Sequence, residues 1–111
     1  MSNQNYRRGA NFERKVKKWY EDNLVGCFVL RSAGSHSPVD LVVLWNGGVA
    51  LVQCKMDGKL PRDEEEKLIK IAKEQRCYAA LAYKEGSVVE IQPLYPIKTA
   101  RKEVHEEEPR A

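Results

Sequence analysis

Hydrophobic residues recur at helical spacing near the start of the chain. They predict a helix over residues 9–23 with one buried stripe, because they follow the i, i+4, i+7, i+8 pattern: Phe12, Val16, Trp19 and Tyr20. Glu13 borders this stripe and does not lie opposite it. We therefore expect its carboxylate near the core side of the helix, where a role in solubility alone is less natural.

Three apolar runs predict strands in the next part of the chain. "GCFVLRS" at 26–32 is a short strand, and a loop of Ser, Gly and Pro follows it. "VDLVVLW" at 39–45 is almost continuously apolar, which is typical of a central strand buried on both faces. Asn and Gly at 46–48 accept the positive φ of tight turns, so they predict a hairpin to the strand "VALVQCK" at 49–55.

The second half of the chain predicts one helix and two strands. The helix covers residues 62–76, with Asp63 as its cap, acids in its first turn and a buried stripe of Leu68, Ile69 and Ala72. "CYAALAYK" at 77–84 and "SVVEIQPL" at 87–94 are strands joined by a short turn. The order α-β-β-β-α-β-β indicates an α/β fold with a mixed sheet packed by helices.

At 111 residues the sequence predicts a single domain over residues 1–111, with no internal repeat. We expect a loose N-terminus at 1–6 and a loose charged tail at 97–111. No apolar stretch approaches the ~20 residues of a membrane span, and the first residues carry no signal-peptide pattern, so we expect a cytoplasmic protein. The cysteines are three, scattered and without a C-x-x-C pair, which argues for reduced, small buried residues: Cys27, Cys54 and Cys77.

Positive charge is concentrated at the start of the chain, although the whole carries only +3. Residues 1–20 contain one acidic residue, Glu13, and six basic residues: Arg7, Arg8, Arg14, Lys15, Lys17 and Lys18. Such a segment can neutralise phosphates, or it can be a solvated helix face, and charge alone does not separate the two.

The hairpin brings three polar residues to one face. A two-residue turn at 46–47 sets Asp40 opposite Gln53, and a turn at 47–48 sets Asp40 opposite Lys55. In both registers the three side chains share a face, with directly opposed Cβ atoms about 4.5–5.5 Å apart. A three-residue turn without a bulge would move Asp40 to the other face.

A carboxylate, an amide oxygen and a lysine within this span suit metal-assisted cleavage of a phosphodiester. Mg²⁺ prefers oxygen ligands and keeps several waters, and it polarises a phosphate. The lysine would stabilise the charge that develops on the phosphate. The alternative from spacing alone is an ion pair between Asp40 and Lys55 that closes the sheet edge.

The segments "YRRGANFERKV", "FVLRSAGS", "VDLVV" and "VQCK" resemble the archaeal-type Holliday junction resolvases, within the PD-(D/E)XK nuclease superfamily. The resemblance covers residues 6–56 closely and 57–94 only in the order of elements. It implies a restriction-endonuclease-like fold and a metal-dependent endonuclease that resolves four-way DNA junctions by paired symmetric nicks. It also implies a homodimer, which two symmetric nicks need. No small-molecule substrate and no membrane is expected.

The resemblance implies a metal centre with Mg²⁺, for which Mn²⁺ would substitute. Asp40 would be the principal metal ligand, and Glu13 would reach the metal directly or through water. Gln53 takes the place usually held by Glu or Asp, Lys55 is the lysine of the motif, and the backbone carbonyl of Cys54 would be a further metal ligand.

Six more residues would act around the DNA. Ser35 looks like the loop serine that these enzymes place near the scissile phosphate, with Ser32 as the weaker choice. Arg7, Arg8 and Arg31 look like phosphate-contacting cations, and His36 is expected to touch DNA.

Two positions depart from the family pattern. Val39 stands where Pro is usual. Gln53 offers an oxygen without charge, so the site has one negative charge fewer for a divalent ion. Two other functions therefore stay open: a nuclease of the same superfamily that acts on duplex DNA, and a DNA-binding module that is inactive because of Gln53. The acidic run at 64–66 is interpreted as a helix start that faces away from DNA.

Overall fold

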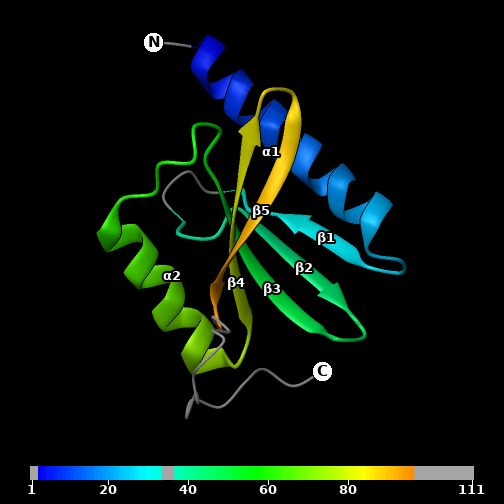
Figure 1. Ribbon diagram of the computed structural model, residues 1–111, viewed down its shortest axis with the longest axis vertical. Coiled ribbons are helices and arrows are strands. Elements are labelled where there is room, and N and C mark those ends of the chain that lie inside the picture. The colour runs from blue at the N-terminus through cyan, green and yellow to red at the C-terminus, as the bar shows by residue number, and fades with distance from the viewer. Residues whose placement is uncertain (1–2, 34–36, 97–111) are drawn as a thin grey trace.

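The computed structural model describes residues 3–33 and 37–96, with side chains from Arg7 onward in the first helix. Its elements are α1 (Asn3–Asn23), β1 (Phe28–Arg31), β2 (Leu41–Trp45), β3 (Gly48–Cys54), α2 (Arg62–Gln75), β4 (Tyr78–Glu85) and β5 (Val88–Tyr95). The predicted order α-β-β-β-α-β-β is confirmed (Figure 1). The expectations for Ser35, His36 and the segment 97–111 lie outside the described residues.

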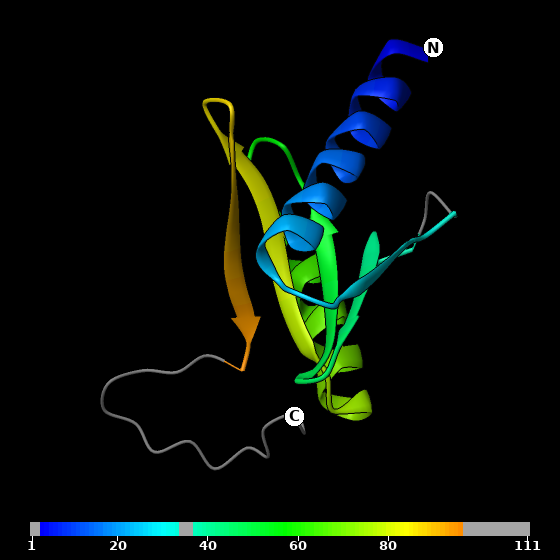
Figure 2. The same ribbon diagram turned by 90° about the vertical axis from the view of Figure 1, so that its right-hand side faces the viewer.

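The strands form one mixed sheet in the order β1-β2-β3-β4-β5. Neighbouring strands are antiparallel except β3 and β4, which are parallel and are connected through α2. This crossover puts a helix on one face of the sheet, and α1 covers the other (Figure 2). The predicted mixed α/β fold is therefore confirmed.

The core has one cluster on each face of the sheet. On the α1 face Phe12, Val16 and Tyr20 pack against alternate residues of β1–β4. On the α2 face Leu68 and Ala72 pack against the intervening residues of β3, β4 and β5. Because successive strand residues point to opposite faces, β3 supplies both clusters and its sequence is apolar almost throughout.

The hairpin takes the first of the two predicted registers. Trp45 pairs with Gly48, so residues 46 and 47 form a two-residue turn. A Cβ on Gly47 would collide with the indole of Trp45, which explains glycine at this place. The pairing runs to Leu41 opposite Val52, and its continuation sets Asp40 beside the next residue of β3.

Three predictions about the elements are wrong. The first helix begins at Asn3 and not at residue 9, because residues 3–8 are mainly polar and carry no apolar period that would mark them. Strand β2 is not buried on both faces: Leu44 is 37% exposed, since α2 packs over β3–β5 instead. Asp63 does not cap α2; Pro61 is the N-cap, without a side-chain hydrogen bond. Neither helix in the described ranges is long and apolar enough to cross a membrane.

Candidate metal and DNA site

Asp40 lies where three strands of the sheet separate. Its backbone N–H donates to the carbonyl of Val52 (2.8 Å), and its carbonyl accepts from the N–H of Ser32 (2.8 Å). Its carboxylate Oδ2 accepts from the backbone N–H of Cys54 (2.8 Å). The side chain thus takes the place of a strand carbonyl at the point where the β2–β3 ladder ends, and this fixes the carboxylate at the end of the sheet.

Charged side chains from both helices influence the carboxylate of Asp40. Burial raises the pKa of its carboxyl, and the Cys54 N–H opposes this. Glu13 raises the pKa further, Lys55 lowers it and Glu64 raises it. One charged side chain from α1, one from the end of β3 and one from α2 therefore share the electrostatic surroundings of this carboxylate.

Gln53 is buried at the same end of the sheet. The residue is 7% exposed, and its side-chain oxygen Oε1 is buried with no hydrogen-bond partner among the described residues. A buried polar oxygen without a partner costs roughly 1–3 kcal/mol. Gln53 lines a cavity of about 280 Å³ with mostly polar walls: Ser37, Pro38, Lys55, Asp63, Glu64 and Lys67. An oxygen kept in this state suits a ligand that the protein alone does not supply.

The ion pair of Lys55 differs from the one that spacing suggested. Lys55 Nζ lies 3.3 Å from Oε1 of Glu64, which is on the first turn of α2. The acidic run is a helix start, as predicted, but the side chain of Glu64 is turned toward Lys55 at the end of the sheet. The sequence carries no signal for this contact, because it depends on how the loop after β3 sets α2 against the sheet.

Glu13 and Arg31 form a pair on the opposite face of the sheet. Arg31 Nη2 lies 3.2 Å from Glu13 Oε1, and Nε donates to the same oxygen (3.2 Å). Both side chains are half-buried. The structure therefore brings together the predicted acid and one predicted phosphate contact, and each neutralises the other in the protein alone.

The Cys54 thiol is unsuited to metal binding. Burial raises its pKa first, the charges of Asp40 and Glu13 raise it further, and Arg31 lowers it. The thiol is therefore protonated at neutral pH, whereas a thiolate is the form that binds metals. The backbone carbonyl, which the sequence analysis named, remains the donor that this residue can offer. All three cysteines are free, and of these Cys77 is buried while the other two are half-buried.

The donors fit a hard divalent cation, although they are poor in acids. Among the described residues no three His, Cys, Asp or Glu side chains gather as a metal-binding group. The oxygens at the end of the sheet are the carboxylate of Asp40, the partnerless amide of Gln53 and the carbonyl of Cys54. Oxygen ligands of this kind suit Mg²⁺, which needs few protein ligands because it keeps waters.

The predicted DNA contacts are distributed around this end of the molecule. Arg7 and Arg8 are exposed near the start of α1, and Ser32 is half-buried after β1. Arg8 also borders a cavity of about 580 Å³ together with Cys54, Lys55, Met56, Asp57, Lys84 and Gly86. Lys84 was missed by the sequence analysis, because a lysine at the end of an apolar strand carries no pattern that distinguishes it.

Comparison with known proteins identifies similar chains. A family model described as "Archaeal holliday junction resolvase (hjc)" matches residues 4–108. Among solved structures, the Holliday junction resolvase Hjc from the archaeal hyperthermophile Archaeoglobus fulgidus is similar with a TM-score of 0.64 and 25% sequence identity. That match covers 86% of this chain and 80% of the other. No curated protein sequence matches.

Proposed function

The chain belongs to the archaeal Holliday junction resolvase family, and from this premise we propose that it is a metal-dependent endonuclease that cuts four-way DNA junctions by paired symmetric nicks. The observation that carries the proposal is the end of the sheet, where the Asp40 carboxylate, the partnerless oxygen of Gln53 and the Lys55 ammonium come from adjoining strand ends. It would act in DNA recombination or repair, or in phage DNA processing, in the cytoplasm.

Mg²⁺ or Mn²⁺ would be held by Asp40, Gln53 and the carbonyl of Cys54, with Glu13 reaching it directly or through water. When bound, the cation polarises the scissile phosphate and so favours attack by water. Asp40 is kept in place by its hydrogen bond from the Cys54 N–H, which leaves its other oxygen available. Lys55 stabilises the negative charge that grows on the phosphate oxygens.

Arginines near the site bind the DNA backbone. Arg7 and Arg8 extend from the start of α1, and a phosphate competes with Glu13 for Arg31. Such an exchange would release the Glu13 carboxylate at the moment when DNA arrives. Ser35, with Ser32 as the weaker choice, and His36 complete the proposed contacts. Junction choice follows from shape and backbone contacts, because nothing in the sequence resembles a base-reading element.

Lys84, near the end of β4, is a further proposed contact to the DNA backbone. It lines the same cavity as Arg8. We expect Lys84→Ala to weaken junction binding and to lower the slope of log K against log salt by about 1, as the loss of one phosphate contact does. Lys70→Ala, which removes an exposed lysine of α2 that pairs with Glu74, is the matched control. Fluorescence anisotropy at several salt concentrations measures both; equal slopes for the two variants would exclude Lys84 from the interface.

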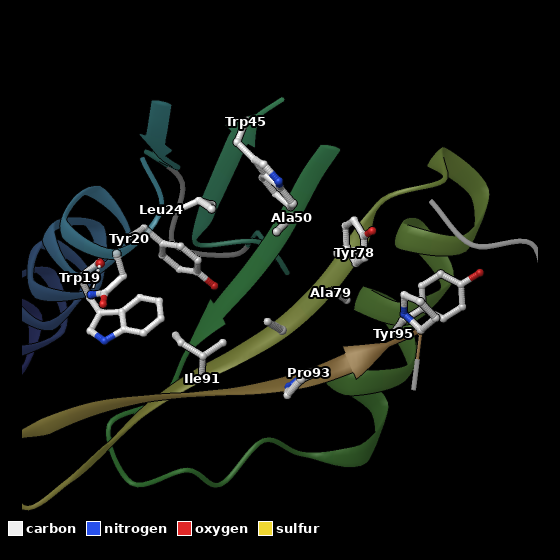
Figure 3. A pocket seen from close by; sticks show the side chains of 13 residues that line it. Trp19, Tyr20, Leu24, Trp45, Ala50, Tyr78, Ala79, Ile91, Pro93 and Tyr95 are labelled. Atoms are coloured by element: carbon white, nitrogen blue, oxygen red, sulfur yellow. Dashed lines mark hydrogen bonds between the residues drawn. The ribbon is translucent and has the colours of Figure 1, made fainter. Parts of the chain in front are cut away.

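A homodimer would present two sites to the twofold junction. We assign its interface to an apolar groove of about 660 Å³ that runs between α1 and strand β5 on the α1 face of the sheet (Figure 3). Trp19, predicted in the buried stripe, is only half-buried and borders it, together with Trp45, Tyr78, Ile91 and others. Trp45 and Tyr78 lie at the strand ends remote from Asp40, whereas Ile91 is level with Cys54 but two strands away, on the edge strand β5. We expect a second copy bound in this groove to leave both sites open to DNA.

Ile91→Arg is expected to convert the dimer to a monomer, because it puts a charge into this groove, and to suppress paired nicking while leaving single nicks. Val88→Arg is the control, since Val88 is an exposed apolar residue of the same strand outside the groove. Size-exclusion chromatography with light scattering measures the mass of each. A wild-type monomer, or a dimer that survives Ile91→Arg, would exclude this interface.

A cleavage assay tests the function as a whole. Labelled four-way junction and linear duplex of matched sequence are incubated with Mg²⁺, Mn²⁺ or EDTA. Symmetric paired nicks in the junction, lost in EDTA, are the expected result. Cleavage of the duplex would instead support a general nuclease, and a mobility shift without cleavage an inactive DNA-binding module, which the amide of Gln53 in place of an acid would explain.

A further inference from the structure

The amide at position 53 leaves the candidate metal site short of charge. Asp40 is the acid at the sheet end itself, and Glu13 is neutralised by Arg31 in the protein alone. Hard divalent cations bind most tightly where carboxylates accompany neutral oxygens, because charge count tunes their affinity. A second carboxylate close to the oxygen of Gln53 would therefore strengthen the binding of a divalent cation.

Glu64 is such a carboxylate. It lines the same cavity as Gln53, and its Oε1 lies 3.3 Å from Nζ of Lys55, two residues along the chain from Gln53. Its position four residues before Leu68, which is completely buried against the sheet, keeps it on the inner side of α2. Glu66, two residues on, is 70% exposed and pairs with Arg62.

We propose that Glu64 supplies the carboxylate that position 53 lacks, so that Asp40, Gln53 and Glu64 from three elements together hold the divalent cation. The inference rests on the metal dependence proposed above. Two independent observations carry it: the ion pair of Glu64 with Lys55, and the oxygen of Gln53, which is more than nine-tenths buried and has no partner in the described ranges.

The ion pair between Lys55 and Glu64 then has a definite role. In the protein alone the Glu64 carboxylate is satisfied by the Lys55 ammonium at 3.3 Å. With a cation bound, Glu64 would be one of the residues that hold it, and the Lys55 ammonium would then be available to the DNA phosphate. Both side chains are partly exposed, which leaves each of them free to change its partner by rotation.

Binding of Mn²⁺ to the DNA-free protein tests the inference, without any need for activity. Mn²⁺ is titrated into the wild-type protein and its variants, and free Mn²⁺ is followed by electron paramagnetic resonance. We expect Glu64→Gln to weaken binding by about tenfold or more, comparable to Asp40→Asn. Glu66→Gln, the matched control on the same helix turn, is expected to bind as the wild type does.

A relocation experiment separates a metal ligand from a residue that only positions Lys55. The double variant Gln53→Glu with Glu64→Gln moves the carboxylate from the helix to the strand, and it is expected to recover most of the Mn²⁺ affinity lost in Glu64→Gln. A residue that acts only by neutralising Lys55 would lose its effect once the ammonium is removed, so Glu64→Gln is also measured in a Lys55→Met background, where loss of a metal ligand would still weaken Mn²⁺ binding. Circular dichroism of each variant establishes that the fold is kept.

The outcomes distinguish this inference from the proposed function. If Asp40→Asn weakens Mn²⁺ binding and Glu64→Gln does not, the assignment of Glu64 is overturned and the metal site stands without it. If the wild-type protein itself binds no Mn²⁺ with or without junction DNA, the proposed metal dependence fails, and the assignment fails with it.

Discussion

Asp40→Asn is expected to reduce junction cleavage by on the order of 10³-fold, because it removes the negative charge of the principal proposed metal ligand. An asparagine keeps an oxygen that can accept the hydrogen bond from the Cys54 N–H, so the strand ends are expected to stay in place. Single-turnover cleavage of a labelled junction in Mg²⁺ measures the rate. Junction binding, followed by gel shift, is expected to change little, since the phosphate contacts are unaltered.

The direction in which Asp40→Asn changes the stability of the fold can be predicted. Burial raises the pKa of the Asp40 carboxyl in the folded protein, so ionisation of this group costs folding free energy and stability falls as pH rises through the pKa. Asparagine has no such cost, and the variant is expected to be at least as stable as the wild type at neutral pH. Cleavage at the wild-type rate by a folded Asp40→Asn protein would remove this residue from the mechanism.

Leu68→Ala is expected to lower the free energy of unfolding by about 3 kcal/mol. Leu68 is 0% exposed and is a large, fully buried side chain of the cluster between α2 and the sheet, so its truncation leaves a cavity that the surrounding strands fill only in part. Urea denaturation followed by circular dichroism measures the loss.

Lys70→Ala serves as the control for Leu68, since Lys70 is exposed on the same helix; the expected change is about 0.5 kcal/mol or less. A loss below about 1 kcal/mol for Leu68→Ala would show that the cluster collapses around the smaller side chain. The contact also matters for the site, because Leu68 holds the helix that carries Glu64.

The helices and strands could be predicted from the sequence wherever hydrophobic residues recur at a regular spacing. The Asn and Gly residues at 46–48 predicted the hairpin with two alternative registers, both of which put Asp40 and Gln53 on one face, and the structure takes the first of them. The polar start of α1 has no apolar period, so the first six residues of the helix escaped detection. Short-range patterns thus predicted the strands that carry the site, because their geometry depends only on neighbours in sequence.

The partners of the charged residues could not be predicted in the same way. Lys55 pairs with Glu64, and Arg31 pairs with Glu13, across gaps that are bridged by loops and by the packing of a helix on a sheet. Each pair depends on the angle between two elements, which no local period encodes. The family resemblance carried over roles for single residues but not these pairings, and the sequence analysis interpreted Glu64 only as part of a helix start that faces away from DNA.

The hydrogen bond from the Cys54 N–H to the Asp40 carboxylate has a consequence for how related sequences are interpreted. A backbone donor at this junction of strands needs an acceptor whether or not any chemistry takes place. An aspartate or asparagine retained here in a divergent homologue can therefore be maintained by architecture alone, and it is poor proof of enzymatic competence. Alanine at this position would forfeit the strand junction as well as the reaction, so asparagine is the better choice for trapping an uncut junction complex.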